Sequence, residues 1–238
     1  SLDGRYVLIY NGETYNYREL RDELRRQGIA FRTDSDTEVV LQVLATRGPA
    51  GLDDLYGMFT LVFVDTATGD ALVARDRSGM KPLYWAESAG RLVISSELGG
   101  VLGSGLVAKE LDDTAINHYL RFRFARKPGT FFAGISELLE GHFISVAGDE
   151  RRDPVCFARA HPLPDPSGGG TDDLLDALEG LLVESIRRHL IADVPVGLLL
   201  SGGIDSTLLL ALIEHHNLAR LETFSIVNDA SEASFGTE

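Results

Sequence analysis

Residues 199–206 read Leu-Leu-Ser-Gly-Gly-Ile-Asp-Ser, a short run that combines glycines, hydroxyls and one carboxylate. Gly202 and Gly203 allow a ligand to approach the backbone closely, because they lack a Cβ atom. Between a strand and a helix, the N–H groups of such a loop and the positive end of the helix dipole favour a phosphate group. Ser201 and Ser206 can add hydroxyl donors, and Asp205 can hold the Mg²⁺ that accompanies a nucleotide. The lysine of the P-loop pattern is absent, so the segment predicts a pyrophosphate-binding loop of another kind.

The segments around this loop predict the elements that would position it. A nearly continuous apolar run from Val194 to Leu200 is typical of a strand buried on both faces. A helix is expected through Leu208 to Glu214, and a second apolar strand from Leu221 to Val227. Strand, glycine loop, helix and strand form a βαβ unit, which predicts the start of a parallel sheet. An ordinary glycine-rich turn is the simpler alternative, and the flanking strand and helix favour the binding loop.

A second run, Tyr10-Asn-Gly-Glu-Thr-Tyr-Asn-Tyr17, contains an Asn-Gly pair. Alone, Asn-Gly is typical of a hairpin turn. Further short motifs follow it in the chain: Ser35-Asp-Thr-Glu38, Gly57-Met-Phe59, Ala74-Arg-Asp-Arg-Ser-Gly-Met-Lys-Pro-Leu-Tyr84 and Ser95-Ser-Glu97.

Strands and a few separated helices are expected before residue 160. Predicted strands cover 6–10, 58–64, 71–74, 91–95 and 142–146, with a hairpin turn at 65–70. Amphipathic helices are expected over 17–27, closed by Gly28, and from a capping box at Ser35 to Gly48. This mixture predicts a layered α+β domain. After residue 170 we expect a long helix that begins at Thr171 and buries one apolar face: Leu174, Leu175, Leu178, Leu181, Leu182 and Ile186.

Two domains are therefore expected, at 1–160 and 171–238, with a Pro- and Gly-rich linker at 161–170. The second has 12 acidic and 3 basic residues, against 24 and 19 in residues 1–170. The net charge of −14 argues against non-specific nucleic-acid binding. A single cysteine excludes a disulfide framework, and no apolar run is long enough to span a membrane. We expect a cytoplasmic protein.

The ordered motifs closely resemble glutamine-dependent asparagine synthetase of the bacterial B type, from Tyr6 to Ile226. The resemblance implies a glutaminase domain with the four-layered αββα fold of N-terminal-nucleophile amidotransferases. It also implies the beginning of an α/β ATP-pyrophosphatase domain. Such enzymes take ammonia from glutamine, adenylate the β-carboxylate of aspartate with ATP and Mg²⁺, and release asparagine, AMP and pyrophosphate. A homodimer is a further expectation.

The resemblance also implies site residues. Asn11 and Gly12 match the oxyanion hole, Glu13 an adjoining glutamine-binding position, and Asp36 the carboxylate that pairs with the α-ammonium of glutamine. The nucleotide-binding positions that match are Leu200, Ser201, Gly202, Gly203, Asp205, Ser206 and Ile226, with Asp205 as the magnesium ligand.

The family's nucleophilic cysteine has no counterpart in the sequence. The chain is therefore expected to be an internal piece of a longer enzyme, with no glutaminase activity of its own. Ser1 has the chemistry of a terminal nucleophile, but a fragment boundary is the preferred interpretation. Cys156 is expected to be a small buried apolar residue.

Three other patterns favour structural interpretations. Residues 103–108 fit a dinucleotide-binding pattern but lie in a glycine-rich stretch. His215 and His216 are adjacent on a helix, so they are expected to point to different faces. The alternation of arginine and aromatic residues over 121–127 fits an amphipathic strand.

Two further functional hypotheses remain open. One is a glutamine-independent relative of the β-lactam synthetase or lasso-peptide cyclase type, or an amidotransferase paralogue that uses another carboxylate. Asn11, Gly12, Glu13 and Asp36 favour the glutamine-dependent enzyme over that relative. The other is a non-catalytic fragment that retains only folding signals.

Overall fold

The structure, a computed structural model, describes residues 1–148, 150–158 and 170–226. It divides into two compact units, Ser1–His161 and Pro162–Glu238, called unit 1 and unit 2 below. Residues 161–169 of the expected linker and Val227 of the expected last strand lie outside the described residues.

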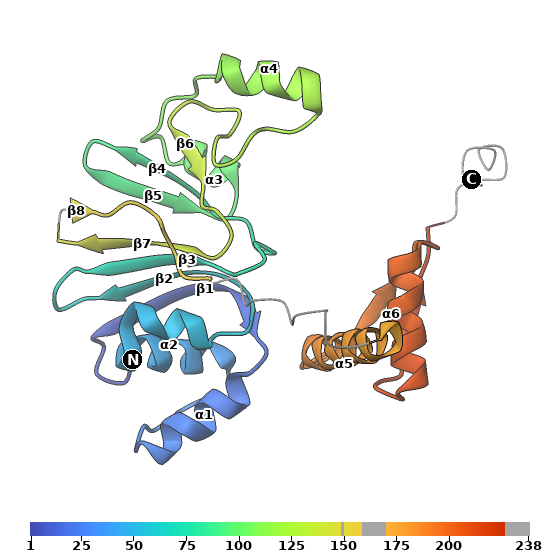
Figure 1. Cartoon of the computed structure of the whole chain (residues 1–238). Helices are drawn as coiled ribbons and strands as arrows, with labels where there is room; N and C mark the ends of the chain where they lie inside the picture. The colour runs from blue at the N-terminus through green and yellow to red at the C-terminus, as the bar shows by residue number, and fades with distance from the viewer. Residues whose placement is uncertain (149, 159–169, 227–238) are drawn as a thin grey trace. The chain divides into compact units, whose positions relative to one another are not determined.

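Unit 1 contains two antiparallel sheets and four α-helices among its described residues (Figure 1). The larger sheet has the order β1-β2-β3-β7-β8, with β9 also paired to β7, and the smaller one has the order β5-β4-β6. The strands are β1 (Tyr6–Thr14), β2 (Gly57–Asp65), β3 (Ala71–Arg75), β4 (Tyr84–Ser88), β5 (Arg91–Ser95), β6 (Ile135–Glu137), β7 (His142–Ala147), β8 (Glu150–Arg151) and β9 (Val155–Cys156). The helices are α1 (Tyr17–Arg26), α2 (Asp36–Arg47), the 3₁₀ helix η1 (Gly48–Asp54), α3 (Leu98–Gly103) and α4 (Asp113–Phe122).

Side-chain alternation along the strands sorts these elements into layers. On β2, Phe59, Leu61 and Phe63 pack in one cluster with the buried residues of α1 and α2, whereas Val62 packs against the smaller sheet. Successive residues of a strand point to opposite faces, so one strand serves both layers. On β4, Trp85 faces the larger sheet, and Tyr84 and Ala86 pack with α3.

The resulting order is helices α1 and α2, the larger sheet, the smaller sheet, and helix α3 (Figure 1). The predicted four-layer αββα fold is confirmed. The predicted hairpin of 58–64 with 71–74 is also present, because β2 pairs with β3 in an antiparallel register.

Two interpretations of local patterns in unit 1 are excluded by the structure. The pair Asn11-Gly12 does not form a hairpin turn: it lies inside β1, opposite Thr60 and Phe59 of β2. The segment 121–127 is not a strand, because Arg121 and Phe122 complete α4 and Arg123 takes a left-handed conformation with φ 66°.

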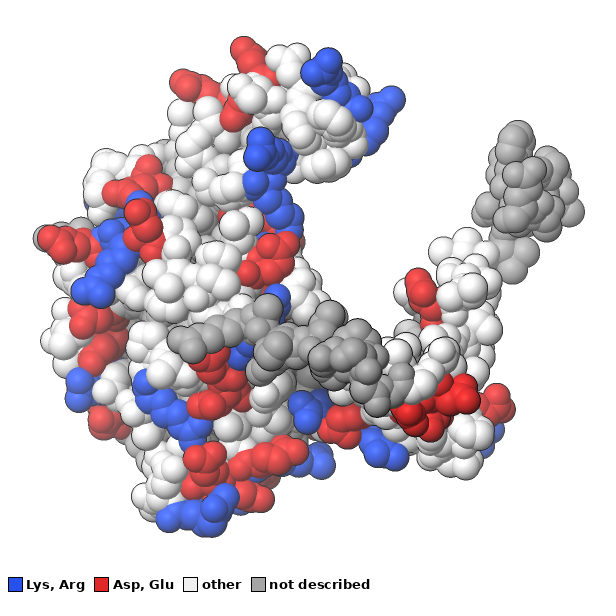
Figure 2. Space-filling view, viewed as in Figure 1, with Lys and Arg blue, Asp and Glu red and all other residues white. Residues whose placement is uncertain are grey.

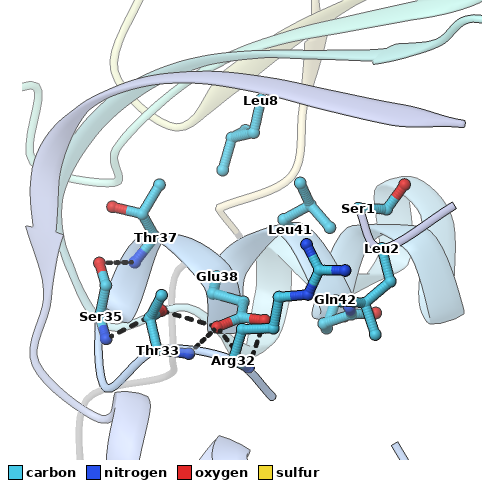
Figure 3. A pocket seen from close by; sticks show the side chains of 10 residues that line it. All are labelled: Ser1, Leu2, Leu8, Arg32, Thr33, Ser35, Thr37, Glu38, Leu41 and Gln42. Atoms are coloured by element: carbon cyan, nitrogen blue, oxygen red, sulfur yellow. Dashed lines mark hydrogen bonds between the residues drawn. The ribbon is translucent and has the colours of Figure 1, made fainter. Parts of the chain in front are cut away.

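The N-terminus of α2 is capped differently from a simple capping box. Ser35 Oγ accepts the N–H of Thr37, as a cap should. Glu38 instead accepts the N–H groups of Arg32 and Thr33 and the hydroxyl of Thr33 (Figure 3). Its carboxylate therefore fixes the loop before the helix and not the capping residue itself.

Unit 2 contains helices α5 (Thr171–His189) and α6 (Ile204–His215) and strands β10 (Gly197–Leu199) and β11 (Glu222–Phe224). The two strands are parallel, as predicted for the start of an α/β sheet. Its core joins the two helices through Val183, Ile186, Leu212 and Ile213.

The burial expected in unit 2 differs from the observed burial. Val194 and Leu199 are 71% and 77% exposed, so this strand is not covered on both faces by the described residues. α6 packs against Val183 and Ile186 of α5. Four leucines of the predicted apolar face of α5 are therefore left exposed: Leu174, Leu175, Leu178 and Leu181. Among the described residues, no helix is long and apolar enough to cross a bilayer.

Figure 2 shows acidic and basic side chains interspersed over the visible face of unit 1. Opposite charges of unit 1 form surface pairs such as Arg5 with Asp65, whose side chains are 48% and 14% exposed. Solvent screens such pairs, so they contribute little to folding.

Candidate functional site

The backbone N–H group of Gly12 points to the outer edge of the larger sheet. β1 is the terminal strand in the order of that sheet, and Gly12 lies opposite Phe59 of β2. Phe59 makes two hydrogen bonds with Asp76 on the side away from β1. Its N–H donates to Asp76 Oδ2 at 3.2 Å, and its C=O accepts the N–H of Asp76 at 2.8 Å. Gly12 and Phe59 therefore form a non-hydrogen-bonded pair of the antiparallel ladder, in which the N–H and C=O groups of the two facing residues point away from each other. The N–H group of Gly12 is therefore directed away from β2.

Asp36 lies at this same edge. Its Oδ2 accepts the N–H of Thr14 at 2.9 Å and the hydroxyl of Tyr10 at 3.2 Å. Thr14 is two residues beyond Gly12, so both backbone N–H groups point the same way. The structure thus brings two of the sequence-predicted residues, Gly12 and Asp36, to one strand edge.

The side chains of Asn11 and Glu13 lie on the opposite face of β1 from Tyr10 and Thr14, and both residues are exposed. Asn11 lines a cavity of about 330 Å³ between the two sheets. Ser95 and Ser96, from another of the predicted motifs, line the same cavity. Two motifs separated by more than 80 residues therefore meet beside the side-chain amide of Asn11.

Gly12 is required where β1 approaches β2. A Cβ atom there would collide with the carbonyl oxygen of Met58 and lie 2.6 Å from Cα and 2.7 Å from Cβ of Phe59. These are backbone and near-backbone atoms, which cannot rotate away. Gly12 therefore permits close strand packing beside the candidate site.

Burial raises the pKa of Tyr10 above its ordinary value of 10.0. The hydrogen bond to Asp36 and the negative charges of Asp36 and Glu13 raise it further, whereas the bond to Thr14 Oγ1 lowers it. Tyr10 is therefore a neutral phenol at ordinary pH. Its hydroxyl can donate to the Asp36 carboxylate and help to fix its orientation.

Two buried charged residues, Arg75 at the end of β3 and Asp76 directly after it, fix the backbone at the same end of the sheet. The carboxylate of Asp76 is fully buried and accepts N–H groups from Phe59, Ser78, Met80 and Lys81. Arg75 is 3% exposed; it pairs with Glu137 at 2.6 Å and donates to the carbonyl groups of Gly79, Lys81 and Leu138.

Arg75 and Asp76 belong to one of the sequence motifs, but no role was expected for either residue. The available signal was two adjacent charges at the end of an apolar strand, followed by a glycine. Gly79 has φ +64°, and a Cβ there would lie 2.6 Å from Glu140.

Neither alternative nucleophile lies near Asn11. The terminal amine of Ser1 donates to the carbonyl oxygen of Tyr6, and its side chain lines a pocket beside α2 with Leu8, Leu41 and Gln42 (Figure 3). The five residues from Tyr6 to Asn11 span about 17 Å of extended strand.

Cys156 is exposed, contrary to the expected burial. The neighbouring Phe157 takes the place in the core, at 7% exposure. Because β9 pairs with β7 at the other side of the sheet, Cys156 is about four strand spacings, or about 19 Å, from β1.

In unit 2, residues 200–203 form the turn from β10 into α6, and residues 204–206 begin that helix. Gly202 has φ +81°, a conformation that favours glycine. Ser201 Oγ accepts the N–H of Gly203 at 3.3 Å and lies 3.1 Å from Ser206 Oγ. These hydroxyls and the first N–H groups of α6 therefore gather at one end of the strand.

Asp205 is exposed in the first turn of α6. Its carboxylate is next to Ser206, and magnesium at nucleotide sites commonly uses one carboxylate together with substrate phosphates and water. The donor set on this turn fits such an ion.

Leu200 and Ile226 both follow the carboxyl ends of the parallel strands. The N–H of Leu200 binds the carbonyl oxygen of Phe224 at 2.8 Å, and Ser225 Oγ donates to the carbonyl oxygen of Leu200 at 2.8 Å. Ile226 itself is 94% exposed. The sequence-predicted residues of unit 2 thus share one edge of the sheet, where ligands of open α/β sheets bind.

Comparisons with known proteins match the two units separately. Residues 1–155 match the family described as "Glutamine amidotransferase domain", and residues 177–235 match the family described as "Asparagine synthase".

A "Putative asparagine synthetase [glutamine-hydrolyzing]" of Mycobacterium tuberculosis is 40% identical over 228 residues, which cover 93% of this chain and 35% of that protein. "Asparagine synthetase [glutamine-hydrolyzing] 1" of Bacillus subtilis is 32% identical over 94% of this chain and 35% of its own length. The chain thus spans about a third of the length of these relatives.

Among solved structures, a glutamine phosphoribosylpyrophosphate amidotransferase of B. subtilis in complex with ADP and GMP has a TM-score of 0.48 and 16% identity. The match covers 98% of this chain and 50% of the amidotransferase chain. From the sequence comparisons, the chain belongs to the glutamine amidotransferase domain family, whose model matches residues 1–155, and its residues 177–235 resemble the asparagine synthase family.

Proposed function

We propose that the protein to which this chain belongs makes asparagine from aspartate, with glutamine as the nitrogen donor and ATP as the activating reagent. One observation carries the proposal: a glutamine amidotransferase match and an asparagine synthase match stand in that order in one chain. Relatives named glutamine-hydrolyzing asparagine synthetases match it across both segments.

Unit 1 would bind glutamine at the outer edge of β1. When a nucleophile attacks the side-chain amide, the carbonyl oxygen gains negative charge, and N–H donors fixed beforehand stabilise it. The backbone N–H of Gly12 and the side-chain amide of Asn11 would supply these donors. Asp36 would attract the α-ammonium of glutamine, and Glu13 would supply an adjoining glutamine-binding position. The single cysteine of this sequence is remote from the edge, so we assign to this chain the binding and oxyanion roles and not the attacking thiol.

Unit 2 would bind the pyrophosphate part of ATP at the turn from β10 into α6. The N–H groups at Gly202 and Gly203 and the hydroxyls of Ser201 and Ser206 would hold phosphate oxygens. Magnesium, when bound, would neutralise part of the phosphate charge, and Asp205 would be its protein ligand. Leu200 and Ile226, at the ends of the two strands, would line the site next to the adenine.

ATP–pyrophosphate exchange by the full-length protein tests the synthetase part. We expect exchange that depends on aspartate and falls at least a hundredfold in Asp205→Ala, because the magnesium ligand is removed. Asp172 is an exposed acidic residue of α5, and Asp172→Ala is the control that should leave exchange unchanged. Exchange that persists in Asp205→Ala refutes the assigned role, and exchange that requires another carboxylate refutes aspartate as the acceptor.

Replacing glutamine by ammonium separates the two sites. Asp36→Asn should raise the KM for glutamine while ammonium-dependent asparagine formation remains at the wild-type rate. An equal loss with both nitrogen sources would place Asp36 outside the glutamine site.

A further inference from the structure

Three metal-binding side chains meet between α5 and α6, in a part of unit 2 that the proposed function does not use. Glu179 comes from the middle of α5, and His215 and His216 come from the end of α6. One ligand atom from each lies within 4.8 Å of the other two. Among the residues that the structure describes, this is the one group of three such side chains at that spacing.

The end of α6 explains why adjacent histidines converge, contrary to the expectation that they point to different faces. His215 is the last helical residue, whereas His216 is the C-cap with φ −92° and ψ 5°, outside regular helical geometry. The φ of His216 differs from the helical value of about −63° and thereby changes the direction of its Cα–Cβ bond relative to His215. The ring centroids are 4.9 Å apart with an interplanar angle of 88°, and His216 Nε2 lies 2.7 Å from Glu179 Oε1.

We propose that Glu179, His215 and His216 form a binding site for a divalent transition-metal ion, with Zn²⁺ as the best fit. Two imidazoles and one carboxylate are typical ligands of zinc, and three protein ligands leave one position for water. Tetrahedral zinc with bonds near 2.0 Å places its ligand atoms about 3.3 Å apart. The most separated pair in the cluster would have to approach by at most about 1.5 Å, which rotation of the exposed His215 side chain can supply.

The surroundings hold the ligands in place and favour a cation. Val183 and Ile186 of α5 pack against Leu212 and Ile213 of α6, which fixes the two backbones that carry the ligands. The C-terminal end of a helix carries partial negative charge, so it favours a cation beside His215 and His216. Asp176 and Glu184 line the same surface cavity as Glu179 and His216, and Arg187, which also lines it, is the opposing charge.

The simplest competing interpretation is an ion pair between Glu179 and His216 that clamps the two helices. That interpretation needs no contribution from His215, which is exposed. The effect of removing His215 therefore distinguishes a metal site from an ion pair. Because His215 is exposed, its replacement by alanine should leave the fold intact.

The test is calorimetric titration of the full chain with Zn²⁺ at neutral pH. We expect one ion per chain, and an affinity at least tenfold weaker in His215→Ala and in Glu179→Gln. His189→Ala, another histidine of unit 2, is the matched control and should bind like the wild type. Absence of stoichiometric binding by the wild type, or wild-type affinity in His215→Ala, overturns the proposal.

Cobalt provides a second measurement that does not depend on heat signals. Co²⁺ bound by two imidazoles and a carboxylate should give visible absorption bands of four-coordinate geometry, which Zn²⁺ should displace. His215→Ala should lose these bands while its circular dichroism stays that of the wild type. Bands of equal intensity in this variant would place the ion elsewhere. The inference is independent of the proposed asparagine synthesis, because both measurements are made without substrates.

Discussion

Asp36 and Thr14 tie the first turn of α2 to the outer edge of β1: Oδ2 of Asp36 accepts the N–H of Thr14 at 2.9 Å. Gly12 lies two residues before Thr14, and its N–H points to the same edge. A carboxylate and a backbone donor therefore lie at the same strand edge. The same contact is structural, because Thr14 is 2% exposed.

Two substitutions of Asp36 separate structure from binding. Asp36→Ala removes the acceptor of the buried Thr14 N–H, so the free energy of unfolding should fall by about 1–3 kcal/mol. Asp36→Asn retains an oxygen acceptor and should cost less than Asp36→Ala. Denaturant unfolding of the full chain measures both. Equal losses in the two variants would show that the charge, and not the acceptor, stabilises this contact.

Gly12→Ala should destabilise unit 1 by about 1–3 kcal/mol, because the added Cβ would overlap backbone atoms of β2. Gly99→Ala is the matched control. Gly99 lies in α3, where an added Cβ would have no atom within 4 Å, and alanine there should stabilise the helix by about 0.5–1 kcal/mol. Urea midpoints of the two variants give the comparison. A midpoint of Gly12→Ala at or above that of the wild type would contradict the close strand packing.

Arg75→Met should cost about 3 kcal/mol, because it removes the buried partner of Glu137 and leaves that carboxylate paired with the more exposed Lys127. The carbonyl groups of Gly79, Lys81 and Leu138 would lose their donor as well. Arg5→Met removes the exposed pair with Asp65 and should shift the thermal midpoint much less, since solvent screens that pair. Similar shifts in the two variants would argue against a structural role for Arg75.

The raised pKa of Tyr10 predicts a loss of stability at alkaline pH. Below pH 10.0, Tyr10 is protonated in both the folded and the unfolded states and contributes no pH dependence. Above this value the unfolded chain loses the proton and the folded chain keeps it. The free energy of unfolding should then fall by up to about 1.4 kcal/mol per pH unit.

Tyr10→Phe isolates this effect. It removes the hydroxyl bonds to Thr14 and Asp36, so it should cost about 0.5–1.5 kcal/mol at neutral pH. The difference between wild type and variant should shrink as the pH rises above 10.0. Chemical denaturation at a series of pH values measures this difference, and a constant difference up to alkaline unfolding would contradict the assigned pKa direction.

The sequence by itself determined half of the described elements of unit 1, because their signals are local: β1, β2, β3, β5, β7, α1 and α2. Two apolar runs on either side of the turn at 65–70 marked β2 and β3, Ser35 marked the start of α2, and Gly28 marked the end of α1. The glycine turn at 200–206 was also readable, since the residues before and after it have the composition of a strand and a helix.

The tertiary structure decided which residues meet. The register of β1 with β2 directs the N–H of Gly12 outward, and this depends on pairing between residues about 47 positions apart. The packing of α2 brings Asp36 to Thr14, and the packing of the two sheets brings Arg75 of β3 to Glu137 of β6. Asn-Gly within β1 shows the limit of local signals: a pair typical of a turn remains extended because strand pairing outweighs local preference. His215 and His216 converge for a similar reason, since the end of α6 and the position of α5, and not their spacing, set their directions.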